Sequence, residues 1–575
     1  MNRHFSIKRE ATDRLIKLFS LKNDEDDLMP ENDEVSETPW KILVLDTHTK
    51  QILSPLFTPN QLHQHGVTLF VDIDSLRSPL PLTAGLYFLT PTNPNISFIQ
   101  TDISSHLYDS CYLSFLYPTQ SEFFPDLARA VASCTPTDYI KGVSEEPLDF
   151  LTYDHNFFST RLTDTLFNLL RPDVDSGAKD NLLKQIASSL ASVLLLLGIH
   201  PIFHSSPTED SQSLTRHVTS FLQSSSSHRP KYQCDVFIFD RTTDFVAPLL
   251  HPWSYFGLIN EVLQFSPARV CWTDKESKTH VENLNGDTDP FWSEHFRASF
   301  EAIGPAVKKC WDDYTAESES VKRSVQQDQT NDTAIKKLDS LTDTKENLDK
   351  HTLIAAEITN AIKTRQLDVL STVSENIVRG TVNEDEVRQI AGLDESSDPS
   401  HPIHRADNAD LVRMLSLLRL TVPMSSPTSA LVSSLEQSLS ALDIPSFSAY
   451  NYIKRNTTHS APSPESTTSG RFSSFISKIA PGGQFRHQHQ RILNDFVDNK
   501  QSAELRAFHV SSPPVHPPPP PSDTVVVFEL GGGTVAEYLA FTAKDSRRKV
   551  IYGCSELLTA SSFLDQLTRL ENLKS

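Results

Sequence analysis

Two short loops hold the residues that are most able to do chemistry. Asp240, Arg241 and Asp244 lie in the sequence DRTTD, directly after the apolar run 236–239. An aspartate at the end of a buried strand can act as a nucleophile in phosphoryl transfer. Phosphatases of that kind also need a carboxylate two residues later as general acid, and Thr242 stands there. We therefore expect the three charged residues to form a hydrogen-bonded network that holds the turn, with Pro248 delaying the next helix.

The second loop is the triplet Gly531, Gly532 and Gly533, which follows the apolar run 525–528. A glycine turn between a strand and a helix can cradle a phosphate group. This one lacks both the GK[ST] ending of a P-loop and the GxGxxG spacing of a dinucleotide site. We favour a structural role, in which the glycines allow a tight turn and a close approach of helix to strand.

No other cluster predicts a metal, a cofactor or a catalytic residue. The histidines of HPIH (His401 and His404) and HQH (His487 and His489) lie in polar stretches without an evident third ligand. The six cysteines include no CxxC pair, which fits buried thiols in a reducing compartment. Asp46 and Asp72 end expected strands but no glycine-rich loop follows the first of them, so we interpret both as turn and cap residues.

Composition excludes several classes of partner. The chain has 575 residues, a net charge of -21 and no long block of lysine or arginine, so nucleic acid is a poor partner. The N-terminus lacks the apolar core of a signal peptide, and the longest apolar run, 193–199, is too short to cross a bilayer. We expect a cytoplasmic protein with only peripheral membrane association.

Regular alternation of strands and helices predicts an α/β domain over residues 40–135, preceded by a docked helix and an acidic linker over residues 1–39. Its expected strands are 42–45, 69–73, 86–89 and 112–115, with a helix over 121–133. A second α/β domain is expected to combine 136–250 with 524–575, because the C-terminal βαβα unit is too small to fold alone. Within it we expect a buried helix over 181–199 and a low-complexity loop over 205–231.

Between the two parts of the second domain, almost all of the apolar periodicity in the sequence predicts helices. We expect a third, mostly helical domain over 251–510, with helices at 256–265, 293–316, 351–380 and 408–420. A projecting hairpin should occupy about 345–420, and the polar stretch 317–347 is either a solvated helix or a mobile loop. The proline-rich segment 511–523 is interpreted as a stiff linker, with an SH3-type ligand as the less favoured alternative.

The DRTTD stretch resembles the signature of the SM (Sec/Munc) family, cytosolic proteins that bind syntaxins and promote SNARE-driven membrane fusion. The matching residues are Asp240, Arg241, Asp244, Pro248, Leu249, Leu250 and Tyr255. Similarity extends to WKILVLD, to residues 349–370, to FELGGGTVAEY and to the C-terminal stretch from VIYGCSEL onward. The runs KTRQLDVL and YGCSEL, with the acidic segment before Trp40, are most similar to the Sly branch, which acts between endoplasmic reticulum and Golgi.

The resemblance implies an arch of two parallel-sheet α/β domains with a helical third domain inserted in the second. It also implies a pocket on the first domain for the N-terminal peptide of a syntaxin, matched here by Phe124, Leu127, Ala128 and Ile140. Phe124, Leu127 and Ala128 share one helical face, which could instead pack on the sheet. Pro125 departs from the branch pattern and puts the start of this helix in doubt.

A second implied surface is the third-domain hairpin, placed in 351–380, where exposed apolar residues would align SNARE helices. The stretch 317–347 corresponds to a loop that covers the hairpin in this branch. It is short and polar here, which argues against strong autoinhibition.

We therefore expect a non-enzymatic SNARE chaperone acting in transport from endoplasmic reticulum to Golgi, at whose membranes it would be peripheral. Its partners would be a syntaxin, assembled SNARE complexes and, further, a Rab GTPase and tethering factors. The alternatives are another SM branch at the plasma membrane or the endosomal and vacuolar system, a generic tether, and a nucleotide-binding α/β enzyme.

Overall fold

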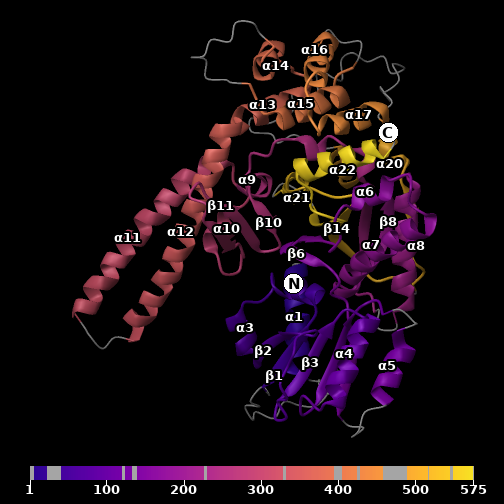
Figure 1. Ribbon diagram of the computed structural model, residues 1–575, viewed down its shortest axis with the longest axis vertical. Helices are drawn as coiled ribbons and strands as arrows, with labels where there is room; N and C mark the ends of the chain where they lie inside the picture. Colours follow the sequence, from indigo (N-terminus) through magenta and orange to yellow (C-terminus); the bar gives the residue numbers. More distant parts are fainter. Residues whose placement is uncertain are drawn as a thin grey trace.

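Apolar runs build the first sheet, and they are buried in its three central strands (Figure 1). In this computed structural model the structure describes residues 6–21, 40–119, 123–132, 139–225, 229–327, 332–393, 405–423, 428–456, 488–500, 502–515, 517–543 and 548–573. The five strands are all parallel, in the order β2 (Val67–Asp72), β1 (Lys41–Leu45), β3 (Ala84–Leu89), β4 (Cys111–Leu116) and β5 (Ile140–Glu146). The four expected strands all form. The boundary predicted at residue 135 is too early, because β5 pairs with β4.

Short crossover helices connect these strands. They are α2 (Thr47–Leu53), α3 (Pro59–Gln64), α4 (Asn93–Ser104) and α5 (Phe123–Ala132). Asp46 begins α2 as an N-cap, with its side chain accepting a hydrogen bond from the Thr49 amide. The cap role predicted for this aspartate is confirmed.

A seven-stranded sheet forms the second layer of the molecule. Its strands are β13 (His509–Ser511), β8 (Ile199–Ser205), β9 (Tyr232–Asp240), β14 (Pro521–Leu530), β15 (Lys549–Cys554), β7 (Phe157–Ser159) and β6 (Leu151–Asp154), in that order. β14 lies between β9 and β15 and is parallel to both, so the C-terminal segment completes the sheet. The expectation that β9 is a buried strand completed by the C-terminal unit is confirmed.

Helices cover this sheet on both faces. They are α6 (Thr165–Leu170), α7 (Ser176–Leu196), α8 (Glu209–Ser224), α21 (Val535–Phe541) and α22 (Ala560–Asn572). α8 occupies the stretch that we predicted as a low-complexity loop over 205–231. Its Leu214, Val218 and Leu222 recur every four residues and are buried, but the serines between them hide that period in the sequence.

The N-terminal helix α1 (Ile7–Ser20) packs between the two sheets. Its Ile7, Ala11, Leu15 and Phe19 are buried in one core with residues of β1, β3 and α7. Lys8 forms an ion pair with Asp287, 2.6 Å away. The helix is therefore docked in the interior, as expected, and does not present its apolar face to a membrane.

The remaining helices form the third part of the molecule. They are α9 (Tyr255–Val262), α10 (Pro290–His295), α11 (Ile303–Gln327), α12 (Asp332–Arg365), α13 (Leu367–Arg379), α14 (Glu384–Ala391), α15 (Asn408–Thr421), α16 (Ser429–Ser440), α17 (Phe447–Asn456), α19 (Gln488–Val497) and α20 (Ala503–Arg506). Among the described residues, no helix is long and apolar enough to cross a membrane.

One small sheet in this part was not predicted, and the predicted position of the hairpin was wrong. A small antiparallel sheet of β10 (Gln264–Ser266), β11 (Arg269–Thr273) and β12 (Thr279–Asn283) interrupts the helices. The projecting pair is α11 and α12, earlier in the chain than the predicted 345–420 (Figure 1). Part of the stretch 317–347 belongs to these two helices.

The glycine turn after β14 is filled by protein. Gly531 and Gly532 have φ values of 85° and 101°, which favour glycine. A Cβ atom at Gly533 would overlap the Tyr552 hydroxyl and lie 2.8 Å from Cys554 Cβ, and both neighbours are buried. The triplet therefore allows close packing, and there is no space for a phosphate group against the Cβ position of Gly533.

We predict that Gly533→Ala lowers the free energy of unfolding by about 2 kcal/mol, because the new methyl group overpacks this contact. Gly286→Ala is the matched control, since no heavy atom lies within 4 Å of its Cβ position. Urea denaturation followed by circular dichroism measures both. Equal midpoints for the two variants would refute the filled-turn interpretation.

Candidate functional site

The first candidate surface is the outer side of α5, the crossover helix between β4 and β5. Phe123 and Leu127 are buried in the core under this helix, and the Phe123 ring packs edge-on against Phe115 with centroids 4.9 Å apart. Phe124 is 48% exposed, and Ala128 is also exposed. The three residues predicted to share one face of this helix therefore point in different directions: Leu127 packs on the sheet, and Phe124 and Ala128 face solvent.

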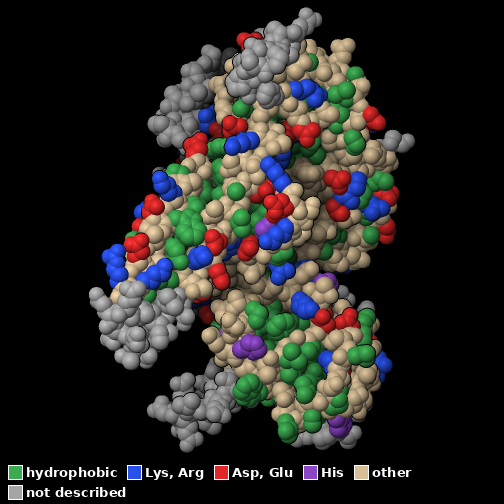
Figure 2. All heavy atoms as spheres, turned by 60° about the vertical axis from the view of Figure 1, so that its left-hand side comes forward, with side chains coloured by type: hydrophobic (Ala, Val, Ile, Leu, Met, Phe, Trp, Pro, Cys, Tyr) green, Lys and Arg blue, Asp and Glu red, His purple; other side chains and the backbone are tan. Residues whose placement is uncertain are grey.

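Ile140 begins β5 and is partly buried against the same core as Leu127. The structure thus brings Leu127 and Ile140 to one core and leaves Phe124 and Ala128 on the surface of the same helix. Most of the large hydrophobic side chains that the described residues expose belong to the lobe built on this sheet (Figure 2). A surface of that kind is typical of a protein-binding site.

The second candidate surface is the helical hairpin of α11 and α12. Charged side chains of both signs are interspersed with hydrophobic ones along it (Figure 2). Ile354 and Ile358 of α12 are fully buried, and Ile362 is partly buried against the same core. Leu353, 45% exposed, is the large hydrophobic side chain that the described part of 351–380 presents to solvent.

A buried polar cluster holds the base of this hairpin. His351 of α12 lies 2.9 Å from the Tyr255 hydroxyl through Nδ1, and 2.9 Å from Asp289 Oδ2 through Nε2. Lys350 Nζ is also paired with Asp289, at 2.5 Å. Burial alone would raise the pKa of Asp289, but these two partners hold it below the ordinary value. Tyr255 therefore contributes a buried hydrogen bond to the base from which the hairpin projects.

Arg241 is the centre of the signature loop, and its partners differ from the expected ones. Its Nη2 donates to both carboxylate oxygens of Glu537, at 2.8 and 2.7 Å, and lies 3.6 Å from Glu529. Its Nε donates to the Gly532 carbonyl, and Nη1 donates to the Asp244 carbonyl. The loop is a hydrogen-bonded turn, as predicted. The Arg241 guanidinium, however, pairs with two glutamates of the C-terminal unit instead of the Asp240 and Asp244 carboxylates.

The two aspartates hold the backbone of the loop. Asp240 accepts hydrogen bonds from the Thr242 amide and hydroxyl, and from the Thr208 hydroxyl at 2.6 Å. Asp244 accepts from the Val246 amide. Both carboxylates are therefore engaged in capping, and neither is aimed into a cavity as a nucleophile would be.

His489 was predicted in a polar loop, and that was wrong. It lies on α19, is 1% exposed, and stacks on Phe239 with ring centroids 4.4 Å apart. Nδ1 is 3.0 Å from Glu529, and Nε2 is 2.9 Å from the Thr243 hydroxyl. Burial would lower its pKa, but the Glu529 carboxylate outweighs burial and raises the pKa above the ordinary value of 6.5. His401 and His404 lie outside the described residues.

Asp244, His489 and Glu537 place ligand atoms within 4.8 Å of one another, which is a geometry that can hold a metal ion. Both Glu537 oxygens already accept hydrogen bonds from the Arg241 guanidinium. Because this guanidinium supplies the positive charge that Glu537 requires, we interpret the group as an ion-pair network and assign no metal to it.

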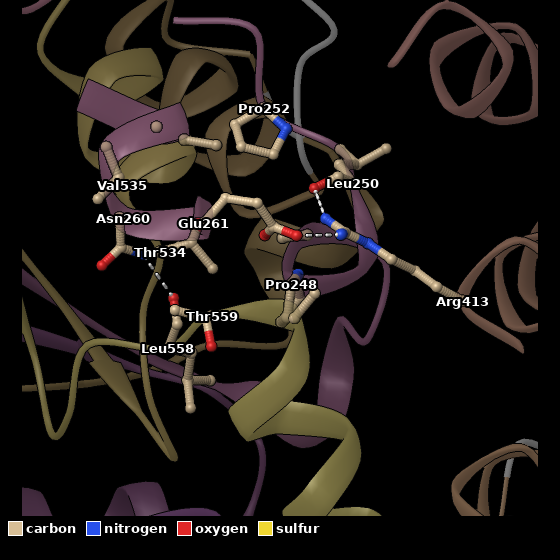
Figure 3. A pocket seen from close by; sticks show the side chains of 14 residues that line it. Pro248, Leu250, Pro252, Asn260, Glu261, Arg413, Thr534, Val535, Leu558 and Thr559 are labelled. Atoms are coloured by element: carbon tan, nitrogen blue, oxygen red, sulfur yellow. Dashed lines mark hydrogen bonds and ion pairs between the residues drawn. The ribbon is translucent and has the colours of Figure 1, made fainter. Parts of the chain in front are cut away.

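Two further signature residues, Pro248 and Leu250, line a small cavity (Figure 3). Pro248 and Leu250 lie on one side, and Thr534 and Thr559, the N-caps of α21 and α22, lie on another. Arg413 donates to the carbonyls of Leu249 and Leu250 and to Glu261. The cavity volume is about 30 Å³, enough for about two water molecules and far too small for a nucleotide.

Sequence reasoning missed Glu529, Glu537, Glu261 and Arg413. One signal could have found Glu537, because Thr534-x-x-Glu537 is a capping box and the structure forms both of its hydrogen bonds. The other three residues pair with partners far away in the sequence, which no local pattern indicates.

We predict that the stabilising contribution of His489 falls as the pH rises above 6.5. A histidine whose pKa is raised by folding stabilises the protein fully below its unfolded pKa, and this contribution is lost as pH rises through the folded pKa. Urea midpoints measured at pH 6.5 and at about pH 8 should differ in the wild type and differ less in His489→Gln. The exposed His509→Gln is the control, and a variant at residue 489 that retained the full pH dependence would contradict the assignment.

Comparison with known proteins finds a matching family and a solved structure of the same fold. The model of the Sec1 family matches residues 41–566. The human Sec1 family domain-containing protein 1 is 24% identical, with 93% of this chain and 94% of that protein covered. The SEC1 family transport protein SLY1 of Arabidopsis thaliana is also 24% identical, with 98% and 96% covered. The crystal structure of Sly1p in complex with an N-terminal peptide of Sed5p has the same fold, with a TM-score of 0.79, 20% identity and complete coverage of both chains. The chain thus belongs to the Sec1 family of SM proteins, and its relatives place it with the Sly branch.

Proposed function

We propose that this protein is a non-enzymatic SM regulator that binds a syntaxin-type SNARE and promotes SNARE assembly in transport between endoplasmic reticulum and Golgi. Membership of the Sec1 family supports the class, and similarity to Sly proteins supports the transport step. The single observation that carries the proposal is the exposed pair Phe124 and Ala128 on α5, in a fold that is shared with a peptide-bound relative.

The first contact is proposed at α5. An apolar side chain from the N-terminal peptide of a syntaxin would cover Phe124 and rest on Ala128, where the small side chain leaves room. Leu127 and Ile140 would support this surface from the core. Because Phe124 is only about half covered in the free protein, it has apolar area left to bury on binding.

The second contact is proposed along α11 and α12. Their anchored base and long exposed faces suit a helical partner, so SNARE helices could be held in register before they assemble. Holding the helices side by side reduces the entropic cost of nucleating a four-helix bundle. The protein would act at the cytoplasmic side of these membranes as a peripheral factor, and a Rab GTPase or a tethering factor would recruit it.

No specific observation favours the nucleotide-binding alternative. The glycine turn is filled by Tyr552 and Cys554, and the cavity beside the signature holds only about two water molecules. The choice of SM branch is open to direct test, because the syntaxin that is retained identifies the branch.

We predict that Phe124→Asp lowers the affinity for the N-terminal peptide of the cognate syntaxin at least about tenfold, because a charge replaces the central apolar contact. Calorimetry with the peptide, and a pull-down of SNAREs from lysate, measure this effect. Phe70→Asp is the matched control: Phe70 is 42% exposed and lies on β2, at the opposite edge of the sheet from β5. Equal losses in both variants would refute the α5 site.

A variant of the hairpin should separate the two contacts. Leu353→Asp is expected to reduce binding of the assembled SNARE bundle several-fold and to leave peptide affinity within about twofold of wild type. Leu442→Asp, at a residue 43% exposed just after α16, is the control. Loss of peptide binding in Leu353→Asp, or full retention of the bundle, would contradict the proposed division of roles.

A further inference from the structure

Five consecutive prolines lie at the surface between β13 and β14, at residues 517–521. The proline ring fixes φ near -65°, and each proline also restricts the residue before it to extended conformations. Pro517 lies in a bend, residues 518–520 belong to no helix, strand or turn, and β14 begins at Pro521. The run therefore has the constraints of a polyproline II helix, which repeats every three residues and makes no hydrogen bonds within itself.

Exposure along the run follows this period of three. Pro517, Pro518, Pro520 and Pro521 are exposed, and Pro519 between them is partly buried. Residues three apart share a column in a polyproline II helix, so 517 with 520, and 518 with 521, form two solvent-facing columns. The third column, containing Pro519, faces the protein. Two adjacent columns of proline rings are what a polyproline-binding groove contacts.

Both ends of the segment are fixed to the second sheet. On one side β13 pairs with β8, and Ser512 donates a hydrogen bond to the Pro201 carbonyl at 3.0 Å. On the other side the Gln233 amide donates to the Pro520 carbonyl at 2.8 Å. A segment held in its extended form in this way loses little conformational entropy when a partner binds.

The charged residues near the proline run in the sequence restrict which type of polyproline-binding domain could bind it. The sequence from 507 to 543 contains no lysine or arginine, and Asp523 next to the run is exposed. A groove that requires a basic anchor within the same linear segment, as acidic SH3-type grooves do, is therefore disfavoured. A groove that reads proline rings by aromatic stacking alone and carries a neutral or basic rim fits both features.

We propose that residues 517–521 form a docking site for a folded partner domain with a WW-type aromatic groove. The two exposed columns, 517 with 520 and 518 with 521, fill this groove. The site lies where the central strand β14 begins, on a different segment from α5 and from the α11–α12 hairpin, and it would recruit a partner without competing for SNAREs.

The test uses the purified full chain with two purified probes, a WW domain and an SH3 domain, and follows the tryptophan fluorescence of each groove. We expect saturable binding of the WW domain and at least about tenfold weaker binding of the SH3 domain. Pro517→Ala with Pro520→Ala should weaken WW binding at least about tenfold, because one whole column is lost. Pro519→Ala, in the column that faces the protein, should change it less than about twofold.

Alanine at residue 520 keeps the carbonyl that accepts from Gln233, so both variants should unfold within about 2 °C of wild type. The proposal is overturned if neither domain binds, if the SH3 domain binds as well as the WW domain, or if Pro519→Ala weakens binding as much as the double variant. A double variant that retains wild-type affinity overturns it equally.

Discussion

The interaction on which the rest of the structure depends is the buried pairing of Arg241 with Glu537 and Glu529. The three side chains have no solvent exposure, and the Arg241 and Glu537 positions are separated by 296 residues. Breaking such a pair leaves a charge in the interior, which costs about 3 to 5 kcal/mol. The pairing therefore fixes the C-terminal unit beside the DRTTD loop and closes a sheet whose strands come from distant parts of the chain.

The same unit supplies the fixed frame for the hairpin. After the loop, Leu249 and Leu250 give their carbonyls to Arg413, and Tyr255 meets His351 and Asp289 at the base of α12. The base is buried and hydrogen-bonded, and the helices beyond it extend away from the body (Figure 1). An arm with a rigid base presents its faces in a defined direction, which a protein that aligns helical partners requires.

Side chains of the protein occupy the places around the signature loop where an enzyme could bind a ligand. The glycine turn, where an α/β enzyme could hold phosphate, is occupied by side chains, and the charged groups of the signature are paired with one another. The contacts that we propose are made instead by surfaces: the exposed side of α5, the faces of the α11–α12 hairpin and the exposed run of prolines. All three lie at the periphery of the two sheets.

The sequence by itself determined the elements whose signals are local. The strands of the first sheet, β9, the C-terminal βαβα unit and the glycine turn follow from apolar runs and turn residues, and the family follows from motifs spread over most of the chain. Leu127 could also be placed on a helix from its neighbours. That it packs inward while Phe124 faces solvent depends on how α5 lies on its sheet, which no spacing along one helix specifies.

Only the tertiary structure decided which distant groups meet. Arg241 with Glu537, His489 with Glu529, and Arg413 with Glu261 each join segments far apart in the chain, and such pairs have no period that a sequence displays. The helix α8 was missed, and the hairpin of α11 and α12 was placed too late in the chain, for a related reason. Polar residues dominate the composition of these helices. The few apolar residues that hold each helix in place can be recognised only when the surface that they pack against is known.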